Sequence, residues 1–186
     1  MASLSYTFWH WKRASVDSAQ YEAQQRAFHS ALAANPPEGF QFSVSSEVAG
    51  AEWANSGGDA YQDRYVVHDF GALESLDQGA VSGARQRSHD NAAAVAAGGV
   101  AGIYSTRLGS PDVAPRFAYW FSKPEGVSYA EVDRALSPLV RDHDAVLWMR
   151  RMVLGPTPEF CLESSTALRL PPGYHALELT LRPIWP

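Results

Sequence analysis

The chain has 186 residues and a mass of 20.3 kDa, with 46% apolar and 19% charged residues. A chain of this size and composition can bury a full core without disulfides or metals, which excludes a disordered or fibrous protein. The net charge is −5 and neither half is basic, which argues against a nucleic-acid-binding protein. Cys161 is the only cysteine, so no intrachain disulfide or paired-cysteine motif can form, and a reducing compartment is favoured.

The sequence shows neither a secretory signal nor a membrane span. Its start lacks a basic segment followed by an apolar one. The longest uncharged run, residues 91–106, contains three glycines and is shorter than the roughly 20 apolar residues that cross a membrane. We therefore expect a soluble, cytoplasmic protein that binds neither nucleic acid nor membrane.

The first 45 or so residues predict a strand, a helix and a second strand. Residues 6–11 are aromatics and threonine, which is typical of a strand. Asp17 is a good N-cap for a helix over 17–34, and the Pro-Pro and glycine of residues 35–39 end it. Apolar residues then alternate with polar ones over 40–44, as in a strand with one buried face.

The next segment predicts the rest of a β-α-β-β-α-β unit, the ferredoxin-like plan. A hairpin-type loop over 54–59 leads into a strand over 61–70. A single long helix is expected over 72–97, and Gly98-Gly99 is its predicted C-terminal stop. A strand over 100–108 closes the unit.

The remaining chain reads as a second copy of this unit. Residues 6–12 align without gaps on 117–123, which pairs Trp9 with Trp120. The same offset pairs Asp17 with Ser128, and Ser128 opens a capping box. Chance similarity is the alternative, since a strand followed by a helix cap is a common pattern; the matched tryptophans favour a true repeat.

The second copy is abridged, because residues 166–173 replace its second long helix. Its other predicted elements are a helix over 128–141 and strands over 146–154, 159–165 and 174–184. The prediction is thus an α+β protein of two ferredoxin-like repeats, residues 1–110 and 111–186, in one compact unit. Its antiparallel sheets carry their helices on the outer face.

This element order and internal repeat resemble the dimeric α+β-barrel superfamily. Its members include stress-responsive barrel proteins, antibiotic-biosynthesis monooxygenase-like and EthD-like proteins, and two-repeat chlorite dismutase-like haem proteins. The resemblance implies two sheets paired into a barrel with helices outside and a pocket inside, here from one chain. It rests on no signature motif, so it transfers no catalytic residue.

The histidines do not predict a metal site, because none has HxH, HxxxH or HExxH spacing. His10 lies between Trp9 and Trp11 on a predicted strand, where an imidazole among rings suits a planar ligand or a general base. The alternative is a strand-edge histidine that bonds a neighbour, and it is the favoured interpretation.

A second group of candidates lies on the strand over 61–70. Arg64 and His68 share one face and could bind a carboxylate or enolate oxygen. The solvated side of an antiparallel pair is the alternative, and we favour it. Tyr65 lies on the opposite face.

Two further motifs are weaker candidates. Arg85 and His89 share a helix face that offers two donors to an anion, but an exposed helix surface is the favoured interpretation. The glycines at 98, 99 and 102 precede a predicted strand, whereas a dinucleotide fingerprint needs a helix after its glycines.

Together these residues predict a small-molecule site between the sheets, lined by strands 6–11, 61–69 and 100–107. Its candidate ligand-binding residues are Trp9, His10, Arg64, Tyr65, His68 and Tyr104. Neighbouring residues of a strand point oppositely, so Trp9 and His10 cannot both face it, and His10 is preferred.

The predicted function is binding or conversion of a small apolar or aromatic molecule, with no required cofactor and haem as an alternative. The competing hypothesis is a structural or assembly protein whose aromatics only fill a core, since aromatic strands bury well without a ligand. The sequence leaves open whether the protein is an enzyme, and it is compatible with a homo-oligomer.

Overall fold

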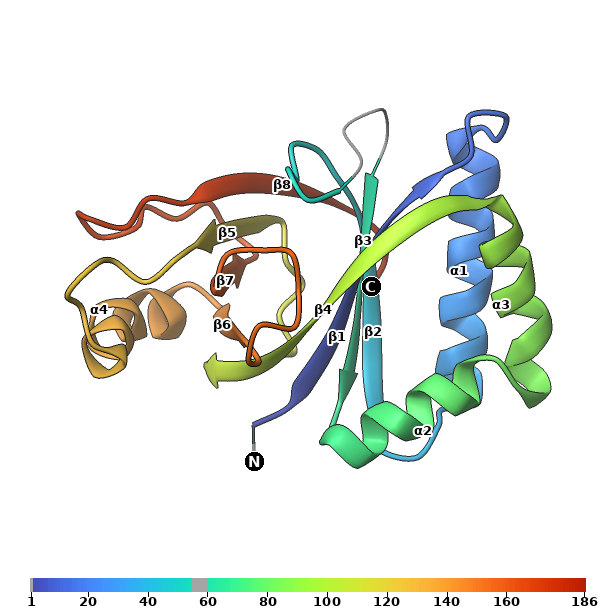
Figure 1. The fold of residues 1–186 in the computed structure, drawn as a ribbon, viewed down its shortest axis with the longest axis horizontal. Helices are drawn as coiled ribbons and strands as arrows, with labels where there is room; N and C mark the ends of the chain where they lie inside the picture. The colour runs from blue at the N-terminus through green and yellow to red at the C-terminus, as the bar shows by residue number, and fades with distance from the viewer. Residues whose placement is uncertain (1, 55–59) are drawn as a thin grey trace.

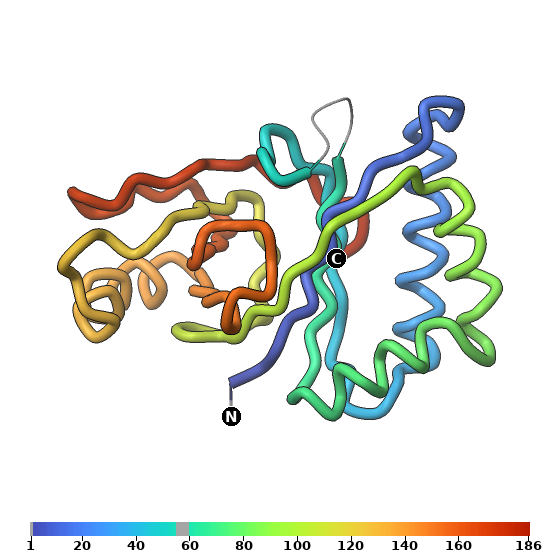
Figure 2. The backbone as a smooth tube through the Cα atoms, in the orientation of Figure 1, coloured from blue at the N-terminus to red at the C-terminus, as the bar shows by residue number. Residues whose placement is uncertain are grey.

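A computed structural model describes residues 2–54 and 60–186. Most of the loop predicted over 54–59 therefore lies outside the described residues. The described part forms eight strands and four helices (Figures 1 and 2). In chain order they are β1 (Leu4–Lys12), α1 (Ser18–Ala34), β2 (Phe40–Val48), β3 (Ala60–Val67), α2 (Phe70–Ala80), α3 (Gly83–Val95), β4 (Ala96–Leu108), β5 (Phe117–Phe121), α4 (Tyr129–Asp142), β6 (Ala145–Arg150), β7 (Phe160–Ser164) and β8 (Leu177–Trp185).

The strands close into one antiparallel barrel in the order β1-β3-β2-β8-β5-β7-β6-β4. Two seams join the halves of the chain: β2 pairs with β8, and β4 pairs with β6. Within each half the order is the same, because β4-β1-β3-β2 corresponds to β8-β5-β7-β6. The prediction of an α+β protein with antiparallel strands is confirmed.

The helices lie on the outside of the barrel. Helices α1, α2 and α3 flank the strands of the first half, and α4 flanks the second half (Figure 1). Both predicted helix starts are present. The Asp17 side chain accepts a hydrogen bond from the Gln20 amide, and Ser128 forms a capping box with Glu131. None of the helices in residues 2–54 and 60–186 is long and apolar enough to cross a membrane.

The predicted long helix over 72–97 is wrong, because the chain forms two helices with a break at Val81 and Ser82. Gly83 has a φ of +58°, which glycine adopts at little cost. Arg85 fixes the break from within α3, since its guanidinium donates to the main-chain oxygens of Gly79 and Asn35 at 2.6 Å each. The residue interpreted as exposed surface is thus half-buried and structural.

Gly98 and Gly99 do not end a helix but lie inside β4, beside β1. A Cβ atom built on Gly99 would lie 2.3 Å from the Phe8 ring, and one on Gly98 would lie 2.9 Å from the Trp11 ring. The glycines therefore allow large rings of the neighbouring strand to cross β4. This close approach, which depends on the tertiary pairing, explains a glycine pair that looks like a helix stop in the sequence.

Strand β3 is buried on both faces. All eight of its residues are buried, including Gln62, Asp63 and Arg64. One face turns to the barrel interior and the other to helices α1–α3, so alternate residues of the strand serve two separate environments. This double burial decides where each candidate residue lies.

Candidate functional site

A cavity of about 840 Å³ lies between the outer face of β1, β3 and β4 and the helices α1–α3. Its lining comes from alternate strand residues, namely Tyr6, Phe8 and His10 of β1 and Asp63 and Tyr65 of β3. The other walls are residues of the helices and the start of β4: Tyr21, Gln25, Phe28, Phe70, Leu73, Glu74, Leu76, Asp77, Ala80, Val81, His89, Ala92, Ala93, Ala96, Ala97, Gly98, Gly99 and Ile103. A concave, mostly apolar space with a few polar groups is typical of a small-molecule site.

Aromatic rings make up one wall of the cavity. Tyr6 stacks on Phe8 with ring centroids 6.3 Å apart, and Phe8 stacks on His10 at 5.1 Å. Phe70 and Val81, at the two ends of α2, also line the cavity and are about half exposed. The rings thus continue from the buried strand face to an apolar rim at the surface.

A buried carboxylate, Asp63, lies at the base of the cavity and is surrounded by donors. Its Oδ2 atom accepts a hydrogen bond from the Tyr65 hydroxyl at 2.8 Å. The Nε2 atoms of His10 and His29 lie 3.0 and 3.3 Å from the same oxygen, outside the angles of a regular hydrogen bond, so these contacts are chiefly electrostatic. Asp63, His10, His29, Tyr65 and Tyr21 are called the Asp63 cluster below.

Two hydroxyl groups orient the imidazoles from their other side. His10 Nδ1 lies 2.6 Å from the Tyr21 hydroxyl, and His29 Nδ1 lies 2.7 Å from the Ser43 hydroxyl. A carboxylate can only accept, so a neutral ring carries its proton on Nε2 and accepts the hydroxyl proton at Nδ1. This arrangement forms a chain from Tyr21, which lines the cavity, through His10 to Asp63.

The environment keeps Asp63 ionised and the tyrosines protonated. Burial acts to raise the pKa of Asp63, but His10 and His29 outweigh it and hold that pKa well below its usual range. Burial, reinforced by the Asp63 charge, raises the pKa values of Tyr21 and Tyr65. Asp63 Oδ1 has no hydrogen-bond partner among the described residues, although Asp63 lines the cavity. Asp63 therefore holds an unused acceptor atom beside the cavity.

The structure divides the predicted site residues between the two sides of the sheet. His10 and Tyr65 line the cavity. Trp9, Arg64 and Tyr104 are buried on the other side, in the barrel interior. The cavity thus borders the three predicted strands but lies outside the barrel, whereas the sequence predicted a site between the sheets. The preference for His10 over Trp9 agrees with this placement.

His68 lies apart from the other candidates. It follows β3, is exposed, and its Nδ1 atom lies 2.9 Å from the Gln41 side-chain nitrogen. The favoured interpretation of Arg64 and His68 as one solvated face is wrong for Arg64, which is only 2% exposed. The second half of the chain covers this face of β3, and the local sequence contains no sign of that cover.

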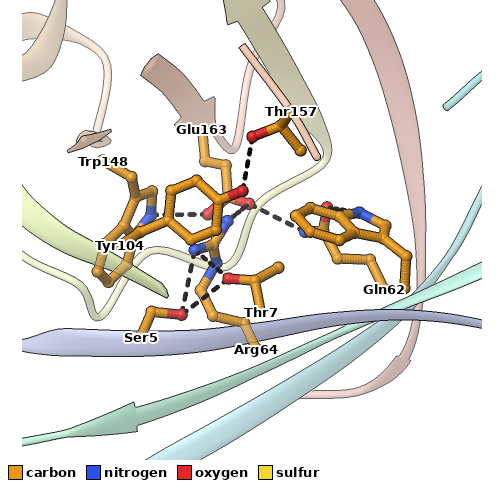
Figure 3. Close-up of polar contacts among 9 residues, drawn as sticks. Ser5, Thr7, Gln62, Arg64, Tyr104, Trp148, Thr157 and Glu163 are labelled. Carbon is orange, nitrogen blue, oxygen red and sulfur yellow. Dashed lines mark hydrogen bonds and ion pairs between the residues drawn. The ribbon is translucent and has the colours of Figure 1, made fainter. Parts of the chain in front are cut away.

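Arg64 forms the centre of a polar network inside the barrel (Figure 3). Its Nη2 atom donates to Glu163 at 2.6 Å, and its Nη1 atom donates to Thr7 at 2.8 Å and to Ser5 at 3.2 Å. The Trp148 indole donates to the same Glu163 at 2.9 Å.

Three further hydrogen bonds lie in the barrel interior. Gln62 joins Trp9 to Glu163 through its amide, and Tyr104 pairs with Thr157 at 2.6 Å. The named polar partners belong to the chain itself, which indicates a structural role for these residues.

Sequence reasoning missed Asp63, Tyr21, Gln25 and His29. The last three lie on the buried stripe of α1 together with Phe28. Polar residues on an otherwise apolar helix stripe are the signal that could have identified them. Asp63 gives no local signal, because its neighbours along the strand are also polar or aromatic.

The histidines of the cavity differ in what they could offer a metal or cofactor. Both ring nitrogens of His10 are engaged within the Asp63 cluster. His89 lines the cavity, is one-third exposed, and has its Nδ1 atom 3.3 Å from Asp90. No group of three or more His, Cys, Asp or Glu side chains in the described ranges could hold a metal ion.

Haem, the alternative raised by the sequence, fits the cavity in only one respect. His89 could supply a nitrogen ligand to the iron, but no Lys or Arg is among the described residues that line the cavity, whereas Asp63, Glu74 and Asp77 are. Two propionates would meet carboxylates instead of cations. The charge of the lining therefore does not fit haem.

Comparison with solved structures supports the architecture. The chain is similar to a proposed monooxygenase from Fusobacterium nucleatum subsp. nucleatum, with a TM-score of 0.67 and 8% identity over 98% of this chain and 93% of that one. A proposed monooxygenase from Lactobacillus acidophilus (TM-score 0.54, 12% identity, 98% and 94% covered) and a proposed chlorite dismutase (0.51, 13%, 98% and 95%) are also similar. The chain is an α+β barrel. No protein-family model and no curated protein matches it, and identities this low show the fold alone.

Proposed function

We propose that the protein binds a small, largely apolar aromatic molecule in the cavity between β1, β3 and β4 and the helices α1–α3. The observation that carries the proposal is the cavity of about 840 Å³ itself, with stacked rings on one wall and a buried carboxylate at its base. Cavities of this size hold drug-sized ligands. The likeness to proposed monooxygenases supports binding of small molecules in this fold.

The test is to fill the cavity by substitution. Ala93 and Ala94 of α3 are both exposed, but only Ala93 lines the cavity. Ala93→Phe is expected to abolish binding of whichever small molecule native mass spectrometry finds on the purified protein, and Ala94→Phe is expected to preserve it. Equal binding by both variants would contradict the site, and no ligand in the source-purified protein or in an aromatic library would favour the structural hypothesis.

A specific observation also favours conversion of the ligand. The Tyr21 hydroxyl is hydrogen-bonded to His10, and His10 contacts the Asp63 carboxylate electrostatically, so His10 is placed to take or return the proton of Tyr21, a residue that lines the cavity. Tyr21→Phe removes that hydroxyl but keeps the ring. We expect this variant to keep ligand binding and to lose turnover of any bound molecule that the wild type converts. Unchanged turnover would exclude the Tyr21 hydroxyl from the chemistry.

We also propose that residues 1–110 and 111–186 are two copies of one ferredoxin-like unit. Support comes from the equal strand orders, from the N-caps Asp17 and Ser128, and from Trp9 and Trp120, whose ring centroids lie 5.5 Å apart. Superposition of residues 5–34 on 116–145 should align both the strand and the helix start. A shifted helix start would contradict the duplication.

The remaining predictions concern the setting in which this function takes place. A cytoplasmic location is proposed because the lone cysteine, Cys161, is buried and unpaired. Independence from a cofactor, an absence of nucleic-acid and membrane partners, and homo-oligomerisation stay predictions. Visible absorption and the solution mass of the purified protein test the cofactor and the oligomer, respectively.

A further inference from the structure

The charged groups around the cavity are unevenly distributed. Asp63 lies at the base, and Glu74 and Asp77 lie on the exposed side of α2 at the entrance. Within the described part of the chain, no Lys or Arg side chain lines the cavity. Arg13 and Arg85, near the two ends of α3, donate instead to main-chain oxygens. A ligand in the cavity therefore meets carboxylates without nearby guanidinium or ammonium groups.

Tyr6 reports the same negative environment from the cavity wall. Burial is the main cause that raises the pKa of the Tyr6 phenol, and the negative charges of Asp77 and Asp63 raise it further. Carboxylates at the entrance and at the base thus both act on the space between them.

The Asp63 carboxylate borders the base of the cavity and is only partly used by its neighbours. Asp63 is 1% exposed, and its Oδ1 atom has no partner in the described residues, although Oδ2 is contacted by three side chains. A buried carboxylate oxygen without a partner is costly, and a ligand that donates to it would recover that energy.

The rings above Asp63 suit a cation as well as an apolar body. Tyr6, Phe8, Phe28 and Tyr65 line the cavity, and the faces of aromatic rings attract organic cations. We propose that the ligand is an arylalkylamine, a planar apolar ring system with a protonated amine on a short alkyl chain, whose ammonium group donates to Asp63 Oδ1.

This inference rests on the proposed function and specifies its ligand class. It excludes anionic ligands such as carboxylates and haem, because their charge would face three carboxylates. Neutral aromatics gain the same apolar contacts, and a hydroxyl can donate to Asp63, but they carry no positive charge for the three carboxylates to attract.

The test compares three probes that share an indole and differ in the end of the side chain: tryptamine (cationic), tryptophol (neutral) and indole-propionate (anionic). Calorimetric titration at neutral pH should show tryptamine binding about tenfold more tightly than tryptophol, and indole-propionate binding most weakly. Equal or tighter binding of the anion would overturn the amine proposal while leaving a ligand site in place. Binding of none of the three would overturn the proposed function itself.

Substitutions test whether the preference for tryptamine over tryptophol depends on the carboxylates of the cavity. Asp63→Asn should lower tryptamine affinity about tenfold, to the level of tryptophol, and leave tryptophol affinity unchanged. If Asp63→Asn does not fold, the exposed pair Glu74→Gln and Asp77→Asn should lower tryptamine affinity about two- to threefold. Glu125→Gln, an exposed carboxylate of the second half, is the matched control and should change neither affinity.

Two results would overturn the assignment to these groups. One is an unchanged ratio of tryptamine to tryptophol affinity in every folded variant. The other is a stoichiometric haemin complex, seen as a shifted visible band that is lost in His89→Ala, because it would show that the cavity accepts an anionic ligand.

Discussion

The two faces of β1 and β3 contain similar polar groups but leave different atoms unused. In the barrel interior the unpartnered atoms are donors, including Arg64 Nε and Trp120 Nε1, and they are enclosed by packed rings. On the outer face a carboxylate oxygen, Asp63 Oδ1, has no hydrogen-bond partner in the described residues, and Asp63 lines a cavity of about 840 Å³. One strand thus contributes alternately to a structural core and to a binding site.

The difference follows from what covers each face. The interior of the first half is filled by side chains of the second, such as Trp120, Trp148 and Glu163. The outer face is covered only by helices, and α3 presents alanines at 92 and 93 to the cavity. Small residues opposite large rings leave space, so the helices enclose a volume that they do not fill.

The largest expected effect comes from a substitution that breaks the polar network in the barrel interior. Glu163→Ala removes the partner of Arg64 and the acceptor of the Trp148 indole, which leaves a buried cation without compensation. The free energy of unfolding should fall by about 3–5 kcal/mol in urea titrations. Glu125→Ala, at an exposed carboxylate, should change it by less than about 0.5 kcal/mol. A similarly small loss for Glu163→Ala would mean that the interior ion pair is not structural.

The next effect concerns Asp63 and depends on pH. Asp63→Asn should cost about 1–3 kcal/mol of unfolding free energy at neutral pH, since it weakens three contacts to Oδ2. The pKa of Asp63 is lower in the folded than in the unfolded chain. Its stabilisation is therefore complete above the unfolded-state pKa of about 4 and is lost as the pH falls through the folded-state value.

Urea titrations at several acidic pH values check this linkage. The difference in unfolding free energy between wild type and Asp63→Asn should be constant near neutrality and shrink below about pH 4. A difference that grows on acidification would contradict the ionised, histidine-stabilised state of Asp63.

The smallest expected effect tests whether His29, the second histidine beside Asp63, takes part in ligand binding. Ser43→Ala removes the hydroxyl that contacts His29, and neither residue lines the cavity. We expect a loss of about 1 kcal/mol in unfolding free energy and no change in tryptamine affinity. Ser45→Ala is the control, because the Ser45 hydroxyl is buried and has no hydrogen-bond partner among residues 2–54 and 60–186, so its removal should cost less. A large loss of tryptamine affinity in Ser43→Ala would extend the site to His29.

The sequence predicted the elements with local signals and missed features that depend on distant packing. The helix starts at Asp17 and Ser128 follow from cap residues that bond their own first turn. The break between α2 and α3 was missed because Arg85 reaches back to Asn35, which is remote in sequence. The Gly98-Gly99 pair was misinterpreted because the rings that require it belong to β1.

The sequence predicted which strands line the candidate site but not on which side of the sheet the site lies. Alternation along residues 61–69 shows that Arg64 and Tyr65 face opposite sides, but it does not show which side holds a cavity. Both sides of β3 are buried, so the usual distinction between a core face and a solvent face fails. Asp63 appears as a site residue only when α1 brings His29 and Tyr21 next to β3.

The most direct test of the central claim is a nuclear magnetic resonance titration that observes both faces at once. The imidazole signals of His10 report on the cavity, and the indole N–H signals of Trp9 and Trp148 report on the barrel interior. On addition of tryptamine, the His10 signals should shift and broaden while those two indole signals stay in place. Movement of the Trp9 and Trp148 signals with an unchanged His10 would place the ligand inside the barrel and contradict the account.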